Sequence, residues 1–321
     1  MAAPAGRTRY VGRRLELSTI RQGLQAAVVG RGGLALITGE PGIGKTRLAE
    51  ETAAEAEAQG VRVCWGRCSD DEGAPAYWPW LQILRECLRD PAAGPLLTAM
   101  GLDAATLAPL LPDPPRAAGT TPALPDPAQR RFRLFDVVTR FLIRLAAARP
   151  LLLVFDDLHR ADRPSLSLLR FLTQDERDAR LFVLVTARDG EAEARHPAAA
   201  DLAALARGPT ARRIALGGLS GDDMARLMEW VTGRRPSAAL AAAVKQQTEG
   251  NPFFVEEVAR QLAVEGLLDR PLSPGLPVRL PHSVQEVAEQ WLDRLSEACR
   301  RVLTVAAVTG REFGVSLLER V

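Results

Sequence analysis

The stretch Gly39-Glu-Pro-Gly-Ile-Gly-Lys-Thr46 decides the fold, because glycines at its first, fourth and sixth positions precede a lysine and a threonine. Before it lies a short apolar run, residues 34–38, that is typical of a buried strand. After it, residues 45–59 are rich in helix-forming alanine, leucine and glutamate, until Gly60 ends the helix. Residues 61–65 then predict a second strand. The order strand, glycine loop, helix, strand is the βαβ unit to which a phosphate-binding loop (P-loop) belongs.

This loop supplies groups suited to the phosphates of ATP. Its glycines allow consecutive backbone N–H groups to point at phosphate oxygens. We expect Lys45 to neutralise the β- and γ-phosphates and the Thr46 hydroxyl to ligate Mg²⁺. Only one other lysine, Lys245, occurs among the 41 basic residues, so an ammonium group in the loop points to chemistry that arginine does not replace. The candidate nucleotide-binding residues of this stretch are Gly39, Glu40, Pro41, Gly42, Ile43, Gly44, Lys45, Thr46 and Arg47.

An acidic pair follows another apolar run. Residues 151–155 are typical of a central parallel strand covered on both faces, and Asp156 and Asp157 come directly after it. A P-loop needs an acidic partner for its metal at the end of a neighbouring strand, and we expect Asp156 to be a magnesium ligand. Asp157 either polarises the attacking water as a general base or holds the waters of the metal ion.

A further buried strand is predicted at residues 181–185, and it runs into Thr186-Ala-Arg188. The carboxyl ends of the strands form the phosphate side of a doubly wound sheet. Arg188 is therefore a candidate catalytic residue that senses the γ-phosphate. The alternative is a surface arginine, since the sequence uses arginine freely. A weaker strand is predicted at 213–216, and together these elements predict an α/β fold with a doubly wound parallel sheet.

The remaining segments are predominantly helical. Nine prolines make residues 91–127 an irregular insertion with one short helix near 102–110, and helices are predicted from residue 128 to about 148 and at 164–174. After Gly218 the strand signal stops, and helical patterns occupy residues 221–232, 237–248 and 253–266. A linker follows at 271–281, and the last forty residues are again helical. The sequence stops within an amphipathic segment, which predicts a piece of a longer protein.

Composition excludes several classes of function. A net charge of +2 creates no strong field for nucleic acid or membrane. No apolar run reaches the roughly 18 residues of a membrane helix, and the first residues lack a signal peptide, so we expect a cytoplasmic protein that makes no membrane contact.

The remaining chemistry-bearing residues form no recognisable site. Four cysteines, Cys64, Cys68, Cys87 and Cys299, do not complete a metal set, and three histidines, His159, His196 and His282, are scattered. The aromatic cluster at residues 77–80 favours core packing over base stacking.

Several motifs together resemble one family. These are Tyr10-Val-Gly-Arg13, the P-loop, Pro75-Ala-Tyr-Trp-Pro-Trp80, Phe155-Asp-Asp-Leu-His159 with Ala161-Asp162, and Thr248-Glu-Gly-Asn-Pro-Phe-Phe-Val-Glu-Glu257. In combination they look like the ATPase module of large ATP-binding LuxR-type transcription regulators, which belong to the signal-transducing (STAND) branch of AAA+ ATPases. The resemblance runs from about residue 10 to 321. Arg160 departs from it, because a tryptophan is common at that position in the family.

The resemblance implies roles for further residues. Val11, Gly12 and Arg13 would lie against the adenine, Arg188 matches the sensor arginine, and Pro252 matches a lid proline near the base. It implies a P-loop nucleotide-binding domain at residues 1–216, a helical lid at 217–270 and the start of a winged-helix domain at 276–321. DNA would be bound only through a helix-turn-helix domain that is absent from this chain.

The leading hypothesis is a switch controlled by ATP, ADP and Mg²⁺. ADP would hold a closed monomer, ATP would release the lid for self-association in response to an unknown inducer, and slow hydrolysis would reset it. One alternative is a turnover ATPase or phosphotransferase with a separate substrate, although no second catalytic constellation is present. Another alternative is the same module beside a nucleotide cyclase or kinase domain.

Overall fold

The computed structural model describes residues 10–69, 74–100, 126–175, 178–188, 198–268 and 296–309. It divides after Gly218 into two compact units.

The first unit is built on a five-stranded parallel sheet in the order β2-β3-β4-β1-β5. The strands are β1 (Gly33–Gly39), β2 (Arg62–Arg67), β3 (Leu151–Asp156), β4 (Leu181–Arg188) and β5 (Ala211–Leu216). Strand β1, which precedes the glycine loop, lies between β4 and β5. The expected α/β P-loop NTPase fold with a parallel sheet is thereby confirmed.

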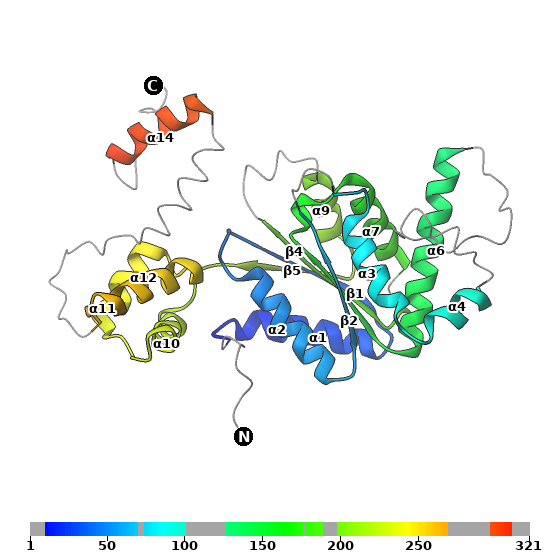
Figure 1. Ribbon diagram of the computed structural model, residues 1–321, viewed down its shortest axis with the longest axis horizontal. Helices are drawn as coiled ribbons and strands as arrows, with labels where there is room; N and C mark the ends of the chain where they lie inside the picture. The colour runs from blue at the N-terminus through cyan, green and yellow to red at the C-terminus, as the bar shows by residue number, and fades with distance from the viewer. Residues whose placement is uncertain are drawn as a thin grey trace. The chain divides into compact units, whose positions relative to one another are not determined.

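Helices cover both faces of the sheet (Figure 1). Helices α1 (Arg14–Val28) and α2 (Lys45–Ala58) lie on one face. The other face carries α3 (Trp78–Leu88), α6 (Pro127–Ala148), α7 (Arg163–Asp175) and α9 (Ala199–Ala206), with the short α4 (Ala93–Ala99) beside α6. Two separate apolar cores result, one on each side of the sheet.

The continuous apolar run of β3 follows from this layering. Leu153 and Phe155 belong to the core on the α3 side, whereas Leu152 and Val154 belong to the core on the α2 side. Because successive side chains of a strand point to opposite faces, a strand covered on both faces needs an apolar residue at every position.

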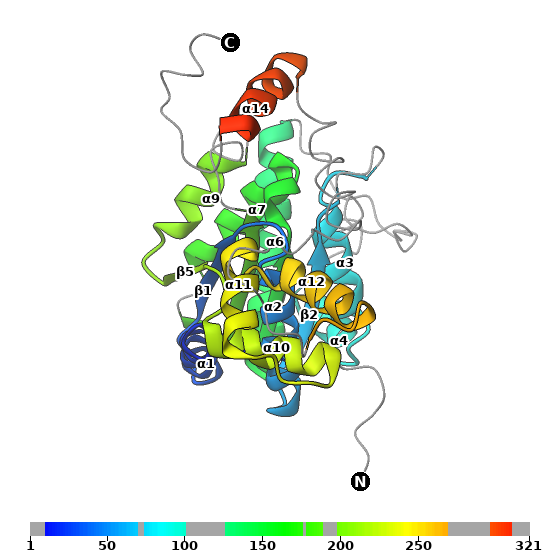
Figure 2. The ribbon, with the colours of Figure 1, turned by 90° about the vertical axis from the view of Figure 1, so that its left-hand side faces the viewer.

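In the second unit, helices α10 (Gly221–Thr232), α11 (Ala238–Thr248) and α12 (Pro252–Val264) pack around one apolar core (Figure 2). Each begins with a polar side chain that accepts a hydrogen bond from a backbone N–H of the first turn: Ser220, Ser237 and Asn251 are the caps. Farther along the chain, α14 (Glu297–Thr309) is the helix described in the region expected to begin a winged-helix domain.

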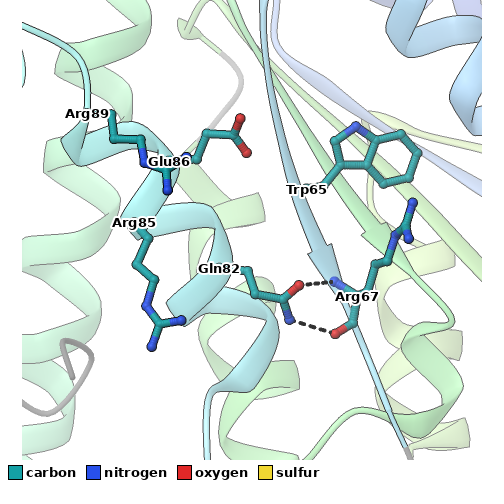
Figure 3. A pocket seen from close by; sticks show the side chains of 6 residues that line it. All are labelled: Trp65, Arg67, Gln82, Arg85, Glu86 and Arg89. Atoms are coloured by element: carbon teal, nitrogen blue, oxygen red, sulfur yellow. Dashed lines mark hydrogen bonds between the residues drawn. The ribbon is translucent and has the colours of Figure 1, made fainter.

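Strand β2 lies at an edge of the sheet, and α3 packs closely against it. At Gly66 a Cβ atom would stand 2.5 Å from the carbonyl oxygen of Pro79, so only glycine fits there. Arg67, the residue after Gly66, is bound by Gln82 of α3. The Gln82 side-chain amide accepts a hydrogen bond from Arg67 N–H at 3.2 Å and donates one to the Arg67 carbonyl at 2.8 Å (Figure 3). The side chain of Gln82 thus forms the two bonds that a neighbouring strand would form at Arg67.

The structure corrects and extends several sequence-based expectations. Helix α4 lies within residues 91–127, where an irregular insertion was expected, because Ala93 is buried against the core that α6 helps to form. Helices α1, α3 and α9 had not been predicted from the sequence. The helix expected near 102–110, the linker at 271–281, His196 and His282 lie outside the described residues.

In the part of the chain that is described, no helix has both the length and the apolar character needed to span a bilayer.

Candidate functional site

The glycine loop joins β1 to α2 at the carboxyl edge of the sheet. Gly39, Gly42 and Gly44 have φ angles of 152°, 75° and 98°, a region that favours glycine. At Gly39 a Cβ atom would approach the carbonyl oxygen of Leu216 to 2.8 Å, while at Gly44 it would meet no atom within 4 Å. The loop is therefore closely packed where it leaves the sheet and open where α2 begins.

Gly44 is the N-cap of α2 and provides no side-chain acceptor to the helix. The first amides of a helix have no intrahelical partner, and the helix dipole favours negative charge at this end. The start of α2 is therefore suited to an anion such as a phosphate group.

Lys45 lies in the first turn of α2 and is 7% exposed. Its Nζ donates hydrogen bonds to the carbonyl oxygens of Gly39 at 3.0 Å and Glu40 at 2.9 Å. The ammonium group is thus folded back into the loop, which is where the phosphates of a nucleotide would require a positive charge.

Thr46 and Asp156, which are 110 positions apart in the chain, meet across the site. The Thr46 hydroxyl donates to Asp156 Oδ1 at 2.9 Å and lies 3.2 Å from Oδ2. Asp156 is 6% exposed, and its Oδ1 also accepts a hydrogen bond of 2.6 Å from the hydroxyl of the fully buried Thr186. These bonds fix the carboxylate between the P-loop helix and β4.

Asp157 occupies the first position after β3 with a left-handed backbone, φ 55°. Its N–H donates to the Thr186 hydroxyl at 2.9 Å, and its side chain is 36% exposed. The Asp157 carboxylate therefore reaches solvent beside Asp156, as a group that polarises water would need to do. The short η2 (Leu158–Arg160) follows, and it places Nδ1 of the buried His159 3.9 Å from Asp157 Oδ1.

Arg188 is the last residue of β4, and it pairs in the sheet with Gly39, the first residue of the loop. It is partly exposed. Strand register therefore brings Arg188 to the edge of the sheet where Thr46, Asp156 and the loop lie.

The N-terminal segment is anchored to the loop through Arg13. Its guanidinium donates to the carbonyl oxygens of Ile43 at 3.2 Å and Gly217, and its side chain is 9% exposed. Arg13 and Gly12 both have a positive φ, and Val11 and Gly12 are partly buried beside them. This segment is thereby tied to the loop and to the end of β5.

Burial raises the pKa of the Tyr10 hydroxyl above its ordinary value, and the charges of neighbouring acidic residues add to this effect while Arg13 and Arg47 oppose it. Arg47 itself pairs with Glu50 at 3.2 Å and with Glu51 at 3.5 Å on the surface of α2. Arg47 is thus oriented along α2 by its own acidic neighbours.

Pro252 belongs to the second unit, where it is the first residue of α12 and is partly buried. The preceding Asn251 is 4% exposed and caps the helix by accepting the N–H of Phe253 at 3.2 Å. The backbone N–H of Leu219 donates to the carbonyl of Gly250 at 2.8 Å, so this turn is also joined to the start of the second unit.

The donor set near Thr46 fits a magnesium ion. Mg²⁺ prefers oxygen ligands and retains several waters, so one hydroxyl and one carboxylate beside phosphate oxygens are sufficient protein ligands. Thr46 and Asp156 already lie within hydrogen-bonding distance. In the described part of the chain, this site included, no group of three His, Cys, Asp or Glu side chains could hold a metal ion by itself, so the phosphates and water would have to supply the other ligands here.

Within the first unit the structure brings the predicted loop residues, Asp156, Asp157 and Arg188 to one edge of the sheet. Thr186 is the residue of this region whose contacts with Asp156 and Asp157 the sequence did not reveal. Its position two residues before Arg188, at the end of a buried apolar strand, was the available signal, since a fully buried hydroxyl needs a partner.

A family profile described as the AAA ATPase domain matches residues 9–185. No curated protein sequence matches the chain significantly.

Among solved structures, the chain is similar to the Walker-type ATPase of Pyrococcus abyssi, with a TM-score of 0.53, 12% identity and coverage of 97% of this chain and 88% of the other. It is also similar to the Aeropyrum pernix ORC2 protein in complexes with ADPNP and ADP, with a TM-score of 0.48, 18% identity and coverage of 97% and 80%. A third is the STAND protein with a tetratricopeptide repeat sensor from Pyrococcus horikoshii, with a TM-score of 0.46, 15% identity and coverage of 93% and 34%. The chain thus spans about a third of that protein's length.

Proposed function

The chain belongs to the AAA ATPase domain family, and from this premise we propose that it is a nucleotide-controlled switch that binds ATP or ADP with Mg²⁺ and hydrolyses ATP slowly. Nucleotide binding, usually with Mg²⁺, is what membership in the family implies. The choice of ATP and ADP, the individual residue roles and the use of the bound state as a signal are the parts that we propose for this chain.

One observation carries the proposal: the Thr46 hydroxyl is hydrogen-bonded to the Asp156 carboxylate at 2.9 Å. A threonine that follows the P-loop lysine and an acid at the end of a neighbouring strand are the protein groups that hold Mg²⁺ in P-loop proteins. Their contact supports a metal site that is already assembled by the fold. The buried Thr186 hydroxyl, bonded to the same carboxylate, supports a fixed orientation of Asp156.

Lys45 and the loop backbone would hold the phosphates. The Nζ of Lys45 lies against the carbonyls of Gly39 and Glu40, so a short movement of a flexible side chain would bring it to a phosphate oxygen. When bound, Mg²⁺ would neutralise charge on the phosphate oxygens. Asp157, exposed beside Asp156, would accept a proton from the attacking water.

Arg188 is our candidate for the residue that distinguishes ATP from ADP. A ligand shifts an equilibrium only through contacts that differ between the two states, and the γ-phosphate is the group that ATP has and ADP lacks. The pairing of Arg188 with Gly39 supports this role. The anchoring of Arg13 to Ile43 supports a binding role for Val11, Gly12 and Arg13 near the base.

The second unit is proposed to act as the lid, with Pro252 near the base. The ADP state would be a closed monomer and the ATP state would self-associate in response to an inducer that we leave open. A transcription regulator of LuxR type, with DNA bound by a separate domain, is the larger context that we propose.

The metal site is tested by equilibrium binding of a fluorescent ATP analogue to wild type, Thr46→Ala, Thr46→Ser and Asp156→Asn, with Mg²⁺ and with EDTA. We expect Mg²⁺ to tighten binding to wild type. Thr46→Ser, which keeps the hydroxyl, should retain that gain, whereas Thr46→Ala and Asp156→Asn should lose most of it. Equal Mg²⁺ dependence in all four proteins would disprove the assignment.

The switch is tested by ADP binding, by the rate of ATP hydrolysis and by the mass of the protein particle in solution. Arg188→Ala should bind ADP with the affinity of wild type. In light scattering, wild type should have a larger mass with ATP than with ADP, and Arg188→Ala should have the same mass with both. Asp157→Asn should bind ATP but hydrolyse it at least about tenfold more slowly, because the general base is lost. Steady-state turnover above about 1 per second would instead favour an ordinary turnover enzyme.

A further inference from the structure

Two cysteines of the first unit lie in contact although 23 positions separate them. The Sγ atoms of Cys64, in β2, and Cys87, in the last turn of α3, are 3.4 Å apart. Both side chains are fully buried, and both are free thiols. The S–S bond of a disulfide is about 2.05 Å long, so the two sulfurs need to approach by only about 1.4 Å to be joined.

The surrounding contacts fix β2 and α3 on either side of this pair. Toward the start of β2, Arg62 forms an ion pair with Asp90, which follows α3. Toward the end of β2, the Gln82 amide binds both backbone groups of Arg67. The thiols lie between these two attachments, so their contact is a property of how the helix packs on the strand.

We propose that Cys64 and Cys87 form a disulfide bond when the folded protein is exposed to hydrogen peroxide. Once local opening exposes it to water, one thiol loses its proton and attacks a peroxide oxygen as its thiolate. The O–O bond breaks to give a sulfenic acid and hydroxide, and the hydroxide takes up the released proton to form water. The second thiol then attacks the sulfenic sulfur, and the S–S bond forms as a second water molecule leaves. The two sulfurs are together oxidised by two electrons and the peroxide is reduced, so two thiols and one peroxide give one disulfide and two waters.

Local opening of α3 gives the oxidant access. Cys87 is the second-last residue of the helix, and terminal turns open more readily than helix interiors. Trp65 and Glu86, the chain neighbours of the two cysteines, help to line an open cavity of about 400 Å³ (Figure 3). Reaction therefore needs movement of the helix end, with release of the Arg62–Asp90 ion pair, and not unfolding of the sheet.

The disulfide would cross-link an edge strand that reaches the candidate nucleotide site. The residue after β2, Cys68, donates its backbone N–H to the carbonyl oxygen of Asp156 at 3.0 Å. Joining β2 to α3 therefore restrains the strand that lies beside the Asp156 backbone. This part of the inference concerns mechanical restraint and does not depend on whether the bound ligand is ATP.

Peptide mapping tests the pairing directly. The whole chain is treated with hydrogen peroxide in its folded state, remaining thiols are blocked with N-ethylmaleimide, and the protein is digested with trypsin without reductant. Cleavage after arginine places each cysteine on its own peptide: Cys64 on residues 63–67, Cys68 on 68–85, Cys87 on 86–89 and Cys299 on 295–300. Each possible pairing therefore has its own mass.

The expected product is the cross-link between peptides 63–67 and 86–89, which disappears on reduction with dithiothreitol. The variant Cys68→Ala should give the same product, and Cys64→Ala should give none. The chain oxidised in urea is the control for non-native pairing, because there the short separation of Cys64 and Cys68 favours their joining.

A folded protein whose Cys64 and Cys87 remain reduced after Cys299 is fully oxidised would overturn the proposal. So would a folded-state product dominated by the pairing of Cys64 with Cys68. A second readout is the melting temperature under non-reducing conditions, which we expect to rise after oxidation in wild type and to stay unchanged in Cys64→Ala. Equal shifts in the two proteins would show that another oxidation is responsible.

Discussion

The Thr186 hydroxyl donates a hydrogen bond of 2.6 Å to Asp156 Oδ1 while it accepts the backbone N–H of Asp157 at 2.9 Å. One buried side chain on β4 thus fixes the carboxylate that meets Thr46 and the backbone of the residue that follows it. The orientation of the Asp156 carboxylate and of the Asp157 backbone therefore depends on the Thr186 hydroxyl, which does not itself have to contact a ligand.

Replacing Thr186 with valine keeps the shape of the side chain and removes the hydroxyl. Because the Asp157 N–H then loses its acceptor, we expect the free energy of unfolding to fall by about 1–3 kcal/mol. We also expect a weaker Mg²⁺ dependence of nucleotide binding, since Asp156 is less firmly oriented. Chemical denaturation and binding titrations measure the two effects, and Thr186→Ser is the control that restores the hydroxyl. A valine variant as stable as wild type would contradict this role.

Lys45 and Lys245, the two lysines of the chain, offer a matched comparison. Lys45→Ala should weaken ATP binding at least about tenfold, or about 1.4 kcal/mol, because the ammonium group would be lost from the loop. Lys245→Ala, in α11, removes the same charge from the other unit and should leave the affinity within about twofold of wild type. Isothermal titration calorimetry checks both, and an unchanged affinity of Lys45→Ala would sink the phosphate assignment.

Gly66 and Gly94 should respond oppositely to replacement by alanine. At Gly66 the new Cβ would lie 2.5 Å from the Pro79 carbonyl oxygen, and relieving this clash should cost about 1–3 kcal/mol of stability. At Gly94, inside α4, a Cβ meets no atom within 4 Å, so alanine should stabilise by up to about 1 kcal/mol through its helix propensity. Urea denaturation measures both variants. If Gly66→Ala were as stable as wild type and only Gly94→Ala lost stability, the packing of α3 on β2 would be contradicted.

Alkaline pH should destabilise the reduced protein in part through Cys64. The hydrogen bond to Cys87 and burial raise the pKa of the Cys64 thiol above its ordinary value of 9.0. Above pH 9 the unfolded chain therefore loses a proton that the folded chain keeps, and stability falls as pH rises, by at most about 1.4 kcal/mol per pH unit for one group. Stability measured with dithiothreitol from pH 7 to 10 should fall less steeply in Cys64→Ala than in wild type. Cys299→Ala, which changes an exposed thiol, should keep the wild-type slope.

The sequence predicted the parts of the fold that depend on local pattern. Apolar runs identified all five strands to within a few residues at each end, and glycine spacing located the loop between β1 and α2. Helix α1 also had a signal, since its buried residues Leu17, Ile20, Leu24 and Ala27 are three or four positions apart. The polar residues between them complete the pattern of an amphipathic helix, so α1 could have been predicted from the sequence and was missed.

Relationships that depend on strand register were not available from the sequence. The contact of Thr186 with Asp156 requires β4 to lie beside β3, and the pairing of Arg188 with Gly39 requires β4 to lie beside β1. The proximity of Cys64 to Cys87 depends on the angle at which α3 returns along β2. No periodicity within one element contains that information.

The bonds between Gln82 and Arg67 also bear on association between copies of the chain. Strand β2 is an edge strand, and exposed edge strands are templates on which other strands pair and aggregate. At Arg67 both backbone groups already have a side-chain partner, so an incoming strand would first have to displace the Gln82 amide. One glutamine side chain thereby blocks intermolecular strand pairing at Arg67, at the end of the sheet nearest the candidate site. No additional strand is needed to cover the edge at this residue.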